Sequence, residues 1–262
     1  MSVLLTTVGS VATVRINRPE ALNSLDEDTK VRLLGVLRQV AADDSVRCVV
    51  LTGEGRAFSA GQDLVEHRAS LRSAPSGDLL ARTVIEHYNP IVLLLATMAK
   101  PVVAAVNGVA AGAGAAFACA ADLRIVAHTA GFNLAFAGVG LSCDSGSSWS
   151  LPRLVGMAKA KELLLLPRTV GAEEALRLGL ATQVVPADDL PAVVAELAGR
   201  LAAGPTLAYG SIRRALAFSA GHDLPEALAH EAELMRLTGA SADHRFAVEA
   251  FVAKQRPTFT GG

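Results

Sequence analysis

Two segments of small residues could present backbone N–H groups to a ligand. They read FSAGQDL at positions 58–64 and NGVAAGAGAAF at positions 107–117. Small side chains let a ligand approach the main chain, and the first turn of a helix has unpaired N–H donors and a dipole that favours negative charge. Two such donors that converge would polarise a carbonyl group and stabilise the oxyanion formed from it. Each segment alone is more typical of close packing, so the chemical interpretation depends on the two together.

Asp144 is the candidate acid or base. It is the only carboxylate between Asp122 and Glu162, and small residues surround it in the segment FAGVGLSCDSGSSWSLPRLVG. A positioned carboxylate can take a proton from a reacting group and return it. Aspartate is also a preferred N-cap and its serine neighbours suit a turn, so residue chemistry alone favours a cap for the helix that follows.

Other reactive side chains are predicted to have structural roles. Cys143 adjoins Asp144, but no histidine partner is evident for a thiolate nucleophile. His67 and His87 lie in a polar segment and are predicted to be solvated surface residues. The remaining candidates are interpreted as turn, cap or packing residues: Asp63, Asp122 and Trp149.

The bulk composition argues against several classes of protein. Of the 262 residues, 51% are hydrophobic and 19% are charged, so the chain can bury one large core. The net charge of -1 gives no reason to expect nucleic acid or an anionic membrane as a partner. The glycine segments match neither a phosphate loop nor a dinucleotide-binding fingerprint. Three cysteines without a CxxC pair indicate free thiols, no metal site and a reducing, cytoplasmic location.

The elements around the glycine segments alternate between strand and helix. SLDE at positions 24–27 has capping-box spacing and predicts the start of a helix. The apolar residues predicted to face the core from this helix are Val31, Leu34, Leu37 and Val40. Apolar runs predict strands at positions 3–7, 11–16, 48–52, 102–106 and 123–127. This alternation predicts an α/β layered architecture.

Two further stretches are harder to interpret. Positions 64–90 are polar and poorly periodic, and are predicted to form a mobile helix-and-loop excursion. Positions 101–122 are about long enough to span a bilayer, but Asn107 and several glycines favour a buried strand, a turn and a buried helix from about 113 to 121. The N-terminus lacks the pattern of a signal peptide.

Helical patterns dominate the chain from Trp149 onward. The last of them carries an apolar stripe, which is predicted to pack on another subunit as well as on its own domain. The stripe consists of Phe246, Val248, Phe251 and Val252.

Taken together, the motifs resemble the crotonase superfamily of enoyl-CoA hydratases and isomerases over essentially the whole chain. In order, they are RINRPEALNSLDEDT, LTGEGRAFSAGQDL, KPVVAAVNGVAAGAGAAFACAADLRIV, LPRLVG, RLGLATQVV and AFVAKQRPTF. The resemblance implies a spiral of ββα units over residues 1–200 and a helical trimerisation region over residues 201–262. It also implies a homotrimer or a dimer of trimers. The substrates would be acyl-CoA thioesters of fatty-acid or phenylacetate metabolism, with coenzyme A as part of the substrate and no separate cofactor.

The resemblance also implies roles for individual residues. The backbone amides of Gln62 and Ala113 match the two donors that hold the thioester oxygen. Hydratases of the superfamily carry glutamates at the positions matching Ala116 and Phe136, which are apolar here, so that two-carboxylate arrangement is not available. Asp144 matches the acidic residue of the double-bond isomerases, and its segment is most similar to the epoxyphenylacetyl-CoA isomerase-like members. Isomerisation needs one group that takes a proton from C2 and returns it to C4.

Several alternatives remain open. A hydratase could use Asp144 with an ordered water, and the loss of both glutamates also suits a catalytically silent acyl-CoA-binding protein. A dehalogenase-like relative uses an aspartate here as a nucleophile, together with a tryptophan and a histidine. The matching positions are Phe136 and Asn89, which argues against dehalogenation.

The coenzyme A end of the site is also implied by the resemblance. Main-chain groups of Ala21, Asn23, Ser59 and Ala60 are predicted to embrace it. Further predicted substrate-binding residues are Gly61, Asp63, Leu64, Gly112 and Phe136. Phe251 and Lys254 match a phenylalanine and a lysine that come from a neighbouring subunit; core packing and a solvated helix end are equally compatible with these two positions.

Overall fold

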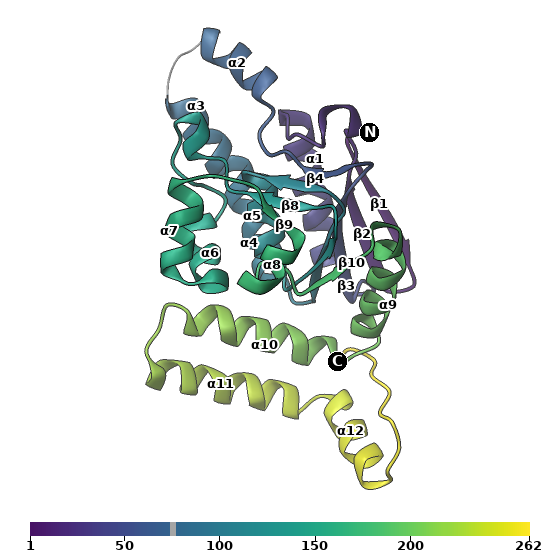
Figure 1. Cartoon of the computed structure of the whole chain (residues 1–262). Helices are drawn as coiled ribbons and strands as arrows, with labels where there is room; N and C mark the ends of the chain where they lie inside the picture. Colours follow the sequence, from purple (N-terminus) through teal and green to yellow (C-terminus); the bar gives the residue numbers. More distant parts are fainter. Residues whose placement is uncertain (74–76) are drawn as a thin grey trace.

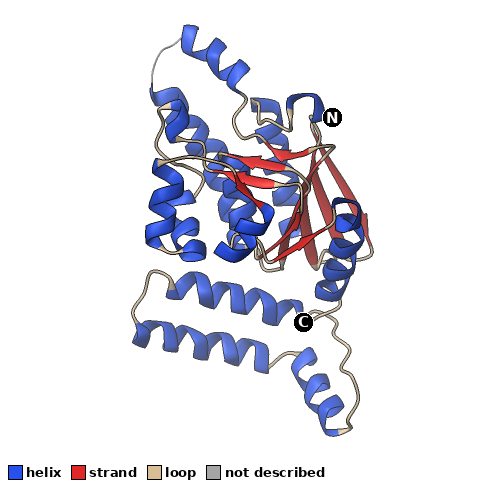
Figure 2. Cartoon of the chain, viewed as in Figure 1, coloured by secondary structure: helices blue, strands red, loops and turns tan. Residues whose placement is uncertain are grey.

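Two β-sheets lie at the centre of the protein, with helices around them (Figure 2). The structure is a computed structural model that describes residues 1–73 and 77–262. The larger sheet has six strands in the order β1-β2-β3-β5-β7-β10. Its strands are β1 (Val3–Val8), β2 (Val11–Ile16), β3 (Cys48–Gly53), β5 (Val102–Val106), β7 (Leu123–Ala127) and β10 (Gln183–Val185). Only the hairpin β1–β2 is antiparallel, and every other neighbour is parallel.

The smaller sheet has four short strands in the order β4-β6-β8-β9. They are β4 (Ala57–Ser59), β6 (Val109–Ala111), β8 (Gly131–Asn133) and β9 (Val170–Gly171). Three times in succession a strand of the larger sheet is followed by a strand of the smaller sheet and then by a helix: β3–β4–α2, β5–β6–α5 and β7–β8–α6. This repeat is the predicted spiral of ββα units, so the α/β fold class is confirmed.

The helices cover both sheets and extend below them (Figure 1). They are α1 (Glu27–Ala42), α2 (Leu64–Ser73), α3 (Gly77–Thr83), the π-helical turn η2 (Val84–Tyr88), α4 (Asn89–Thr97), α5 (Ala113–Ala120), α6 (Ser147–Val155), α7 (Met157–Leu165), α8 (Ala172–Leu178), α9 (Leu190–Ala202), α10 (Thr206–Ser219), α11 (Leu224–Gly239) and α12 (Ala242–Val252). The described residues also form single 3₁₀ turns at η1 (Pro19–Ala21), η3 (Ala137–Val139) and η4 (Ala187–Asp189).

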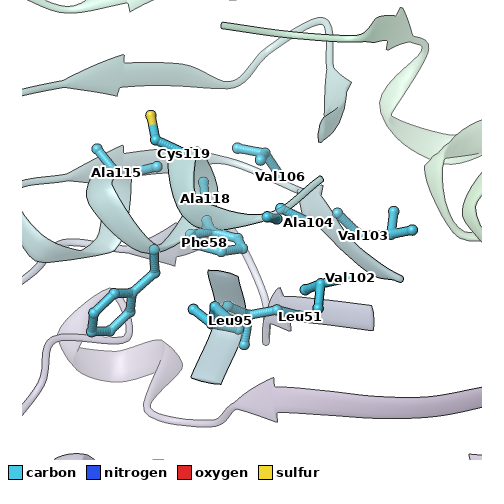
Figure 3. Close-up of a cluster of buried hydrophobic side chains, with 14 of the residues drawn as sticks. Leu51, Phe58, Leu95, Val102, Val103, Ala104, Val106, Ala115, Ala118 and Cys119 are labelled. Carbon is cyan, nitrogen blue, oxygen red and sulfur yellow. The ribbon is translucent and has the colours of Figure 1, made fainter. Parts of the chain in front are cut away.

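The core lies where β5 and α5 meet. Every residue of β5 is buried, which is the pattern of a parallel strand covered on both faces. Side chains from β3, β4 and α4 join it, among them Leu51, Phe58 and Leu95 (Figure 3). The stretch 101–122 is therefore the buried strand, turn and helix that the sequence predicts, and its small residues allow α5 to approach the sheet closely.

Helix boundaries differ from the sequence expectations at two places. The N-cap of α1 is Asp26, whose carboxylate accepts a hydrogen bond from the Thr29 N–H at 2.9 Å, rather than Ser24. The helix therefore begins later than expected, and Val31 is 54% exposed instead of facing the core. Downstream, the helical pattern that follows Trp149 is interrupted, because Gly156 adopts a positive φ of 78° between α6 and α7.

The segment 64–90, predicted as a mobile helix-and-loop excursion, is helical over nearly all of its described residues. It forms α2, α3, η2 and the start of α4, and positions 74–76 lie outside the described residues. The continuous helix Gly77–Thr97 is long and apolar enough to cross a membrane by length and composition alone, a test that core helices of non-membrane proteins also pass. The absence of a membrane partner stays a prediction.

The C-terminal arm, defined here as α10 to α12, lies below the sheets in Figure 1. Arg213 of α10 attaches it to the core: its buried guanidinium donates to Asp122 Oδ1 at 2.8 Å and to the carbonyl of Lys100 at 2.7 Å. Asp122 also accepts from the Val102 N–H at 2.7 Å, so its carboxylate links β5 to α10. The preceding helix α9 packs on β3 and β5 and ends at Ala202. The division between residues 200 and 201 stays a prediction.

Candidate active site

The two glycine segments touch each other main chain to main chain. A Cβ atom added to Gly61, which has a φ of 83°, would lie 2.7 Å from the Ala111 carbonyl oxygen and 3.3 Å from the Ala113 nitrogen. A Cβ atom added to Gly114 would lie 2.4 Å from the Ser59 carbonyl oxygen. Only glycine allows these approaches, because any Cβ at such distances would push the segments apart. The structure therefore brings together the two turns that the sequence marks as possible donors.

The amides of Gln62 and Ala113 are free to donate. The Leu25 N–H donates to the Gly61 carbonyl at 2.8 Å, and the Asp63 N–H donates to the Leu25 carbonyl at 3.2 Å. These two bonds make Gln62 the partner of Leu25 in a parallel β-bridge, and in such a bridge the N–H of the partner residue points away from the neighbouring strand. Ala113 is the first residue of α5, where an amide has no intrahelical acceptor. Within the described parts of the chain, neither amide donates a hydrogen bond.

One cavity of about 100 Å³ lies against both donors. Seven of the predicted site residues line it: Ala60, Gln62, Leu64, Gly112, Ala113, Phe136 and Asp144. Its other lining residues are His67, Leu80, Thr83, Val84, Tyr88, Ala135, Val139 and Leu141. Most of these are apolar, which lowers the local dielectric and strengthens hydrogen bonds to a developing charge.

Asp144 faces this cavity and does not cap a helix. The N-cap of α6 is Gly146, and no side chain caps it. Only the main-chain carbonyl of Asp144 takes part in the turn, accepting the Ser147 N–H at 2.9 Å. Burial raises the pKa of the Asp144 carboxyl, while a 2.7 Å hydrogen bond from the Ser145 hydroxyl opposes that shift. The cap interpretation, which residue chemistry alone favoured, is therefore wrong.

Apolar residues occupy the two positions that the resemblance matches to the glutamates of hydratases. Ala116 is fully buried in α5, and Phe136 lines the cavity. Asp144 is the only carboxylate among the described residues that line the cavity. Asn89, which matches the histidine of the dehalogenase-like relative, lines a separate groove between α4, α6 and α10. His67 reaches the cavity wall, in contrast to the expectation that it is only a surface residue.

Asp63, Asn23 and Ser59 form a buried scaffold behind the donors. The Asp63 carboxylate caps α2 by accepting the Val65 N–H at 3.0 Å, as the sequence predicts for a cap residue. The fully buried Asn23 side chain donates to the Ala57 carbonyl at 2.7 Å, and the Asn23 carbonyl accepts from the Ser59 hydroxyl at 2.8 Å. None of these three lines the cavity, and neither do Ala21 and Gly61. Their role as coenzyme A contacts stays a prediction.

Phe251 and Lys254 lie at the far end of the C-terminal arm. Phe251 is 84% exposed on α12, and Lys254 follows the helix with a φ of 54°. Neither residue lines the cavity that holds Asp144. The expectation that both serve a neighbouring subunit stays a prediction.

Among the cavity residues that sequence reasoning missed, Tyr88 is the one that donates a hydrogen bond to Gln62. It is 2% exposed, lines the cavity beside Asp144, and donates its hydroxyl hydrogen to the Gln62 side-chain oxygen. It lies in the π-helical turn η2. No periodic pattern marks this position, because a π turn breaks the 3.6-residue period on which helix prediction depends.

The ββα spiral and a cavity bounded by two free amides define a protein of the crotonase class. The sequence model of the family described as enoyl-CoA hydratase/isomerase matches residues 6–262, and the chain belongs to this family. Over the residues that the structure describes, no group of three or more His, Cys, Asp or Glu side chains could hold a metal ion.

Individual relatives carry both hydratase and isomerase names. The chain is 44% identical over 251 residues to 1,2-epoxyphenylacetyl-CoA isomerase of Escherichia coli (strain K12), covering 96% of this chain and 95% of the relative. It is 41% identical over 251 residues to a Rhodobacter capsulatus protein named "Probable enoyl-CoA hydratase", with the same coverage of 96% and 95%. A crystal structure of a Mycobacterium abscessus protein named "putative Enoyl-CoA hydratase/isomerase" superposes with a TM-score of 0.94 at 42% identity, covering 99% of this chain and 100% of that one.

Proposed function

We propose that this protein is an enoyl-CoA isomerase in which Asp144 moves a proton between two carbon atoms of an acyl-CoA thioester. The observation that carries the proposal is the position of Asp144. Asp144 lines the same cavity as Gln62 and Ala113, whose backbone amides are free, and it is the only acidic residue among the described residues on that cavity. One acid–base group beside one oxyanion site matches the needs of a 1,3-proton shift.

The reaction would proceed in two proton transfers. The thioester oxygen of a 3-enoyl-CoA accepts hydrogen bonds from the Gln62 and Ala113 amides. The Asp144 carboxylate removes a proton from C2, and the electron pair delocalises over a dienolate whose negative charge rests largely on that oxygen. The protonated Asp144 then delivers the same proton to C4, and the product is the conjugated 2-enoyl-CoA. Burial favours this cycle, because the raised pKa of Asp144 makes the carboxylate a stronger base.

Hydration is the second candidate, favoured by the hydratase name of a close relative. Adding water across a double bond needs activation of the water and delivery of a proton, a task that two carboxylates share more readily than one. The apolar side chains of Ala116 and Phe136 supply neither. A hydratase would therefore have to use Asp144 alone with an ordered water, and a silent acyl-CoA-binding protein would use it for neither reaction.

The names of the relatives are the basis for proposing an acyl group. The Escherichia coli relative is named for a ring-derived phenylacetyl thioester. Ring-derived 3-enoyl thioesters are therefore the first substrates to test, followed by aliphatic ones. Coenzyme A would be held as part of the substrate, with no separate cofactor, in a homotrimer or a dimer of trimers in the cytoplasm.

The test is isomerisation by the wild type and by Asp144→Asn. We expect the wild type to convert a 3-enoyl-CoA to the conjugated 2-enoyl-CoA, measured as a gain in absorbance at the conjugated enoyl band. We expect Asp144→Asn to lower kcat at least about 100-fold, because the general acid–base is removed. Asp188→Asn, which changes an exposed aspartate of η4, is the matched control and should keep wild-type activity.

Three results would contradict the proposal. Near wild-type turnover by Asp144→Asn would remove Asp144 from the mechanism. Loss of absorbance when a 2-enoyl-CoA is supplied would favour hydration. Binding of acyl-CoA, measured by titration calorimetry, without turnover of any enoyl-CoA would favour the silent protein.

A further inference from the structure

The side-chain oxygen of Gln62 accepts two buried donors from different helices. The Tyr88 hydroxyl of η2 donates a hydrogen bond to Gln62 Oε1. The Lys30 ammonium of α1 lies 3.4 Å from the same oxygen. Tyr88 and Lys30 are each only 2% exposed, and hydrogen bonds between buried groups are electrostatically stronger than in water.

The Lys30 ammonium determines which end of the Gln62 amide faces the two donors. Lysine can only donate hydrogen bonds, so the oxygen of the side-chain amide must point towards it. The Gln62 nitrogen then points the other way, where its partner is the Asp63 carbonyl at a distance of 3.5 Å. Lys30 itself is held by the Thr83 hydroxyl at 3.3 Å and by the Glu66 carboxylate at 3.9 Å. The orientation of the Gln62 side chain is therefore set by groups that are themselves fixed.

Tyr88 also contacts the helix that carries the second proposed donor. Its ring meets the ring of Phe117 in α5 edge-on, with centroids 5.9 Å apart. Ala113, the second proposed donor, is the first residue of the same helix. Tyr88 occupies this place because η2 is a π-helical turn, which shifts the side chains that follow relative to a regular α-helix. Single π turns of this kind occur frequently at functional sites.

We propose that Tyr88, together with Lys30, is a positioning residue for the oxyanion amide at Gln62. The inference rests on the proposed function, because it assigns to Tyr88 a role in holding the donor that function requires. The Leu25 bridge fixes the Gln62 main chain on one side, and the Tyr88 and Lys30 hydrogen bonds fix the end of its side chain on the other. With both ends held, the Gln62 N–H has one direction, towards the cavity. Tyr88 need not touch the substrate to act in this way.

The principal test is Tyr88→Phe, which keeps the ring against Phe117 and removes only the hydroxyl. We expect kcat to fall about tenfold with KM changed less than about twofold, because a displaced donor weakens the transition state more than the bound ground state. The matched control is Tyr209→Phe. Tyr209 is the other tyrosine of the chain, lies on α10, and does not line the cavity. It should behave as the wild type.

A spectroscopic measurement separates positioning from general support of the fold. Hydrogen bonds to the thioester oxygen polarise a conjugated acyl group, so bound 2,4-dienoyl-CoA should absorb at longer wavelength than the free thioester. We expect this red shift to be full in Asp144→Asn, which keeps both amides, and smaller in Tyr88→Phe. Gln62→Met removes the side-chain oxygen that accepts from both Tyr88 and Lys30, so the red shift should fall by about as much as in Tyr88→Phe. Adding Tyr88→Phe to Gln62→Met should then have no further effect.

The outcomes distinguish this inference from the proposed function. An unchanged red shift and unchanged kcat in Tyr88→Phe would overturn the role of Tyr88 while leaving isomerisation intact. An equal loss from Tyr88→Phe in the wild-type and Gln62→Met backgrounds would also overturn it, because the effect would not pass through Gln62. If wild-type protein binds the dienoyl thioester without any red shift, the oxyanion site and the role of Tyr88 both fail. If Asp144→Asn keeps both its red shift and its turnover, only the acid–base assignment fails.

Discussion

The cavity region and the C-terminal arm differ in how much of their surface one chain covers. In α5, which carries the second amide donor, seven of eight residues are buried. In α12, one of eleven residues is buried, and Phe251 is 84% exposed. The cavity therefore obtains its apolar walls and its fixed amides from the chain itself, whereas the described part of the chain leaves the apolar side chains of α12 half to largely exposed. Exposed apolar stripes of this kind mark interaction surfaces.

The difference indicates that the core and the arm have different functions. The proposed chemical groups are Asp144 and the amides of Gln62 and Ala113, and all of them come from the core of one chain. The proposed contacts of the arm, Phe251 and Lys254, would bind the distant coenzyme A end of a substrate held by a neighbour. Changes in the core should therefore alter turnover, and changes in the arm should alter substrate binding.

Among the variants that compare the core with the arm, Gly61→Ala is expected to have the largest effect. A Cβ atom there would lie 2.7 Å from the Ala111 carbonyl oxygen, and the φ of 83° strains any L-residue. The two donor segments must move apart, so we expect kcat/KM to fall about 100-fold and the free energy of unfolding to fall by about 1–3 kcal/mol. Gly9→Ala is the matched control, because Gly9 also has a positive φ of 57° but has nothing within 4 Å of the added Cβ. Equal loss of activity in both variants would show that the contact between the segments is unimportant.

A smaller effect, on binding alone, is expected from Lys254→Glu in the arm. Reversing this charge should raise the KM for acyl-CoA about tenfold with little change in kcat, because phosphate contacts are made equally in the ground and transition states. Steady-state kinetics on one 3-enoyl-CoA would measure both constants. A fall in kcat at unchanged KM would break the division between core and arm.

The smallest effect is expected in the stability of Asp144→Asn. Burial raises the folded-state pKa of Asp144 above its ordinary value of 3.8, so the folded state binds more protons than the unfolded state between those two values. The contribution of the Asp144 carboxyl to the free energy of unfolding is therefore complete below pH 3.8 and is lost as the pH rises through the folded-state pKa. Asparagine carries no charge, so the Tm of Asp144→Asn should exceed that of the wild type at pH 7, and the difference should shrink at acid pH. A lower Tm at pH 7 in thermal melts would contradict this reasoning.

Much of the fold could be predicted from local patterns. The apolar run of β5, the hairpin β1–β2 and the start of α5 lie where the sequence places them. Such patterns are predictive because a strand buried on both faces is a continuous run of apolar residues, and a tight turn is marked by glycine. Capping was harder to predict, since Ser24 and Asp26 are both good caps and only the bonded Thr29 N–H distinguishes them.

The candidate site was predictable in its residues but not in its arrangement. Glycines at 61 and 114 and a lone acid at 144 can be read from the sequence, as can the family resemblance that relates them. The direction of the Asp144 side chain could not be read, because a cap and a cavity acid have the same residue type and the same neighbours. Tyr88 left no local signal at all, since its partner Gln62 is 26 positions away.

The sequence by itself determined which residues are small, which are apolar and where the chain must turn, because these properties act over a few neighbouring residues. Tertiary structure alone decided that two turns more than 40 residues apart meet, that Asp144 faces the same cavity, and that a buried tyrosine and lysine share one glutamine oxygen. Those outcomes depend on the packing of whole elements against each other. No local preference encodes them, because each contact exists only after the sheets and helices have assembled.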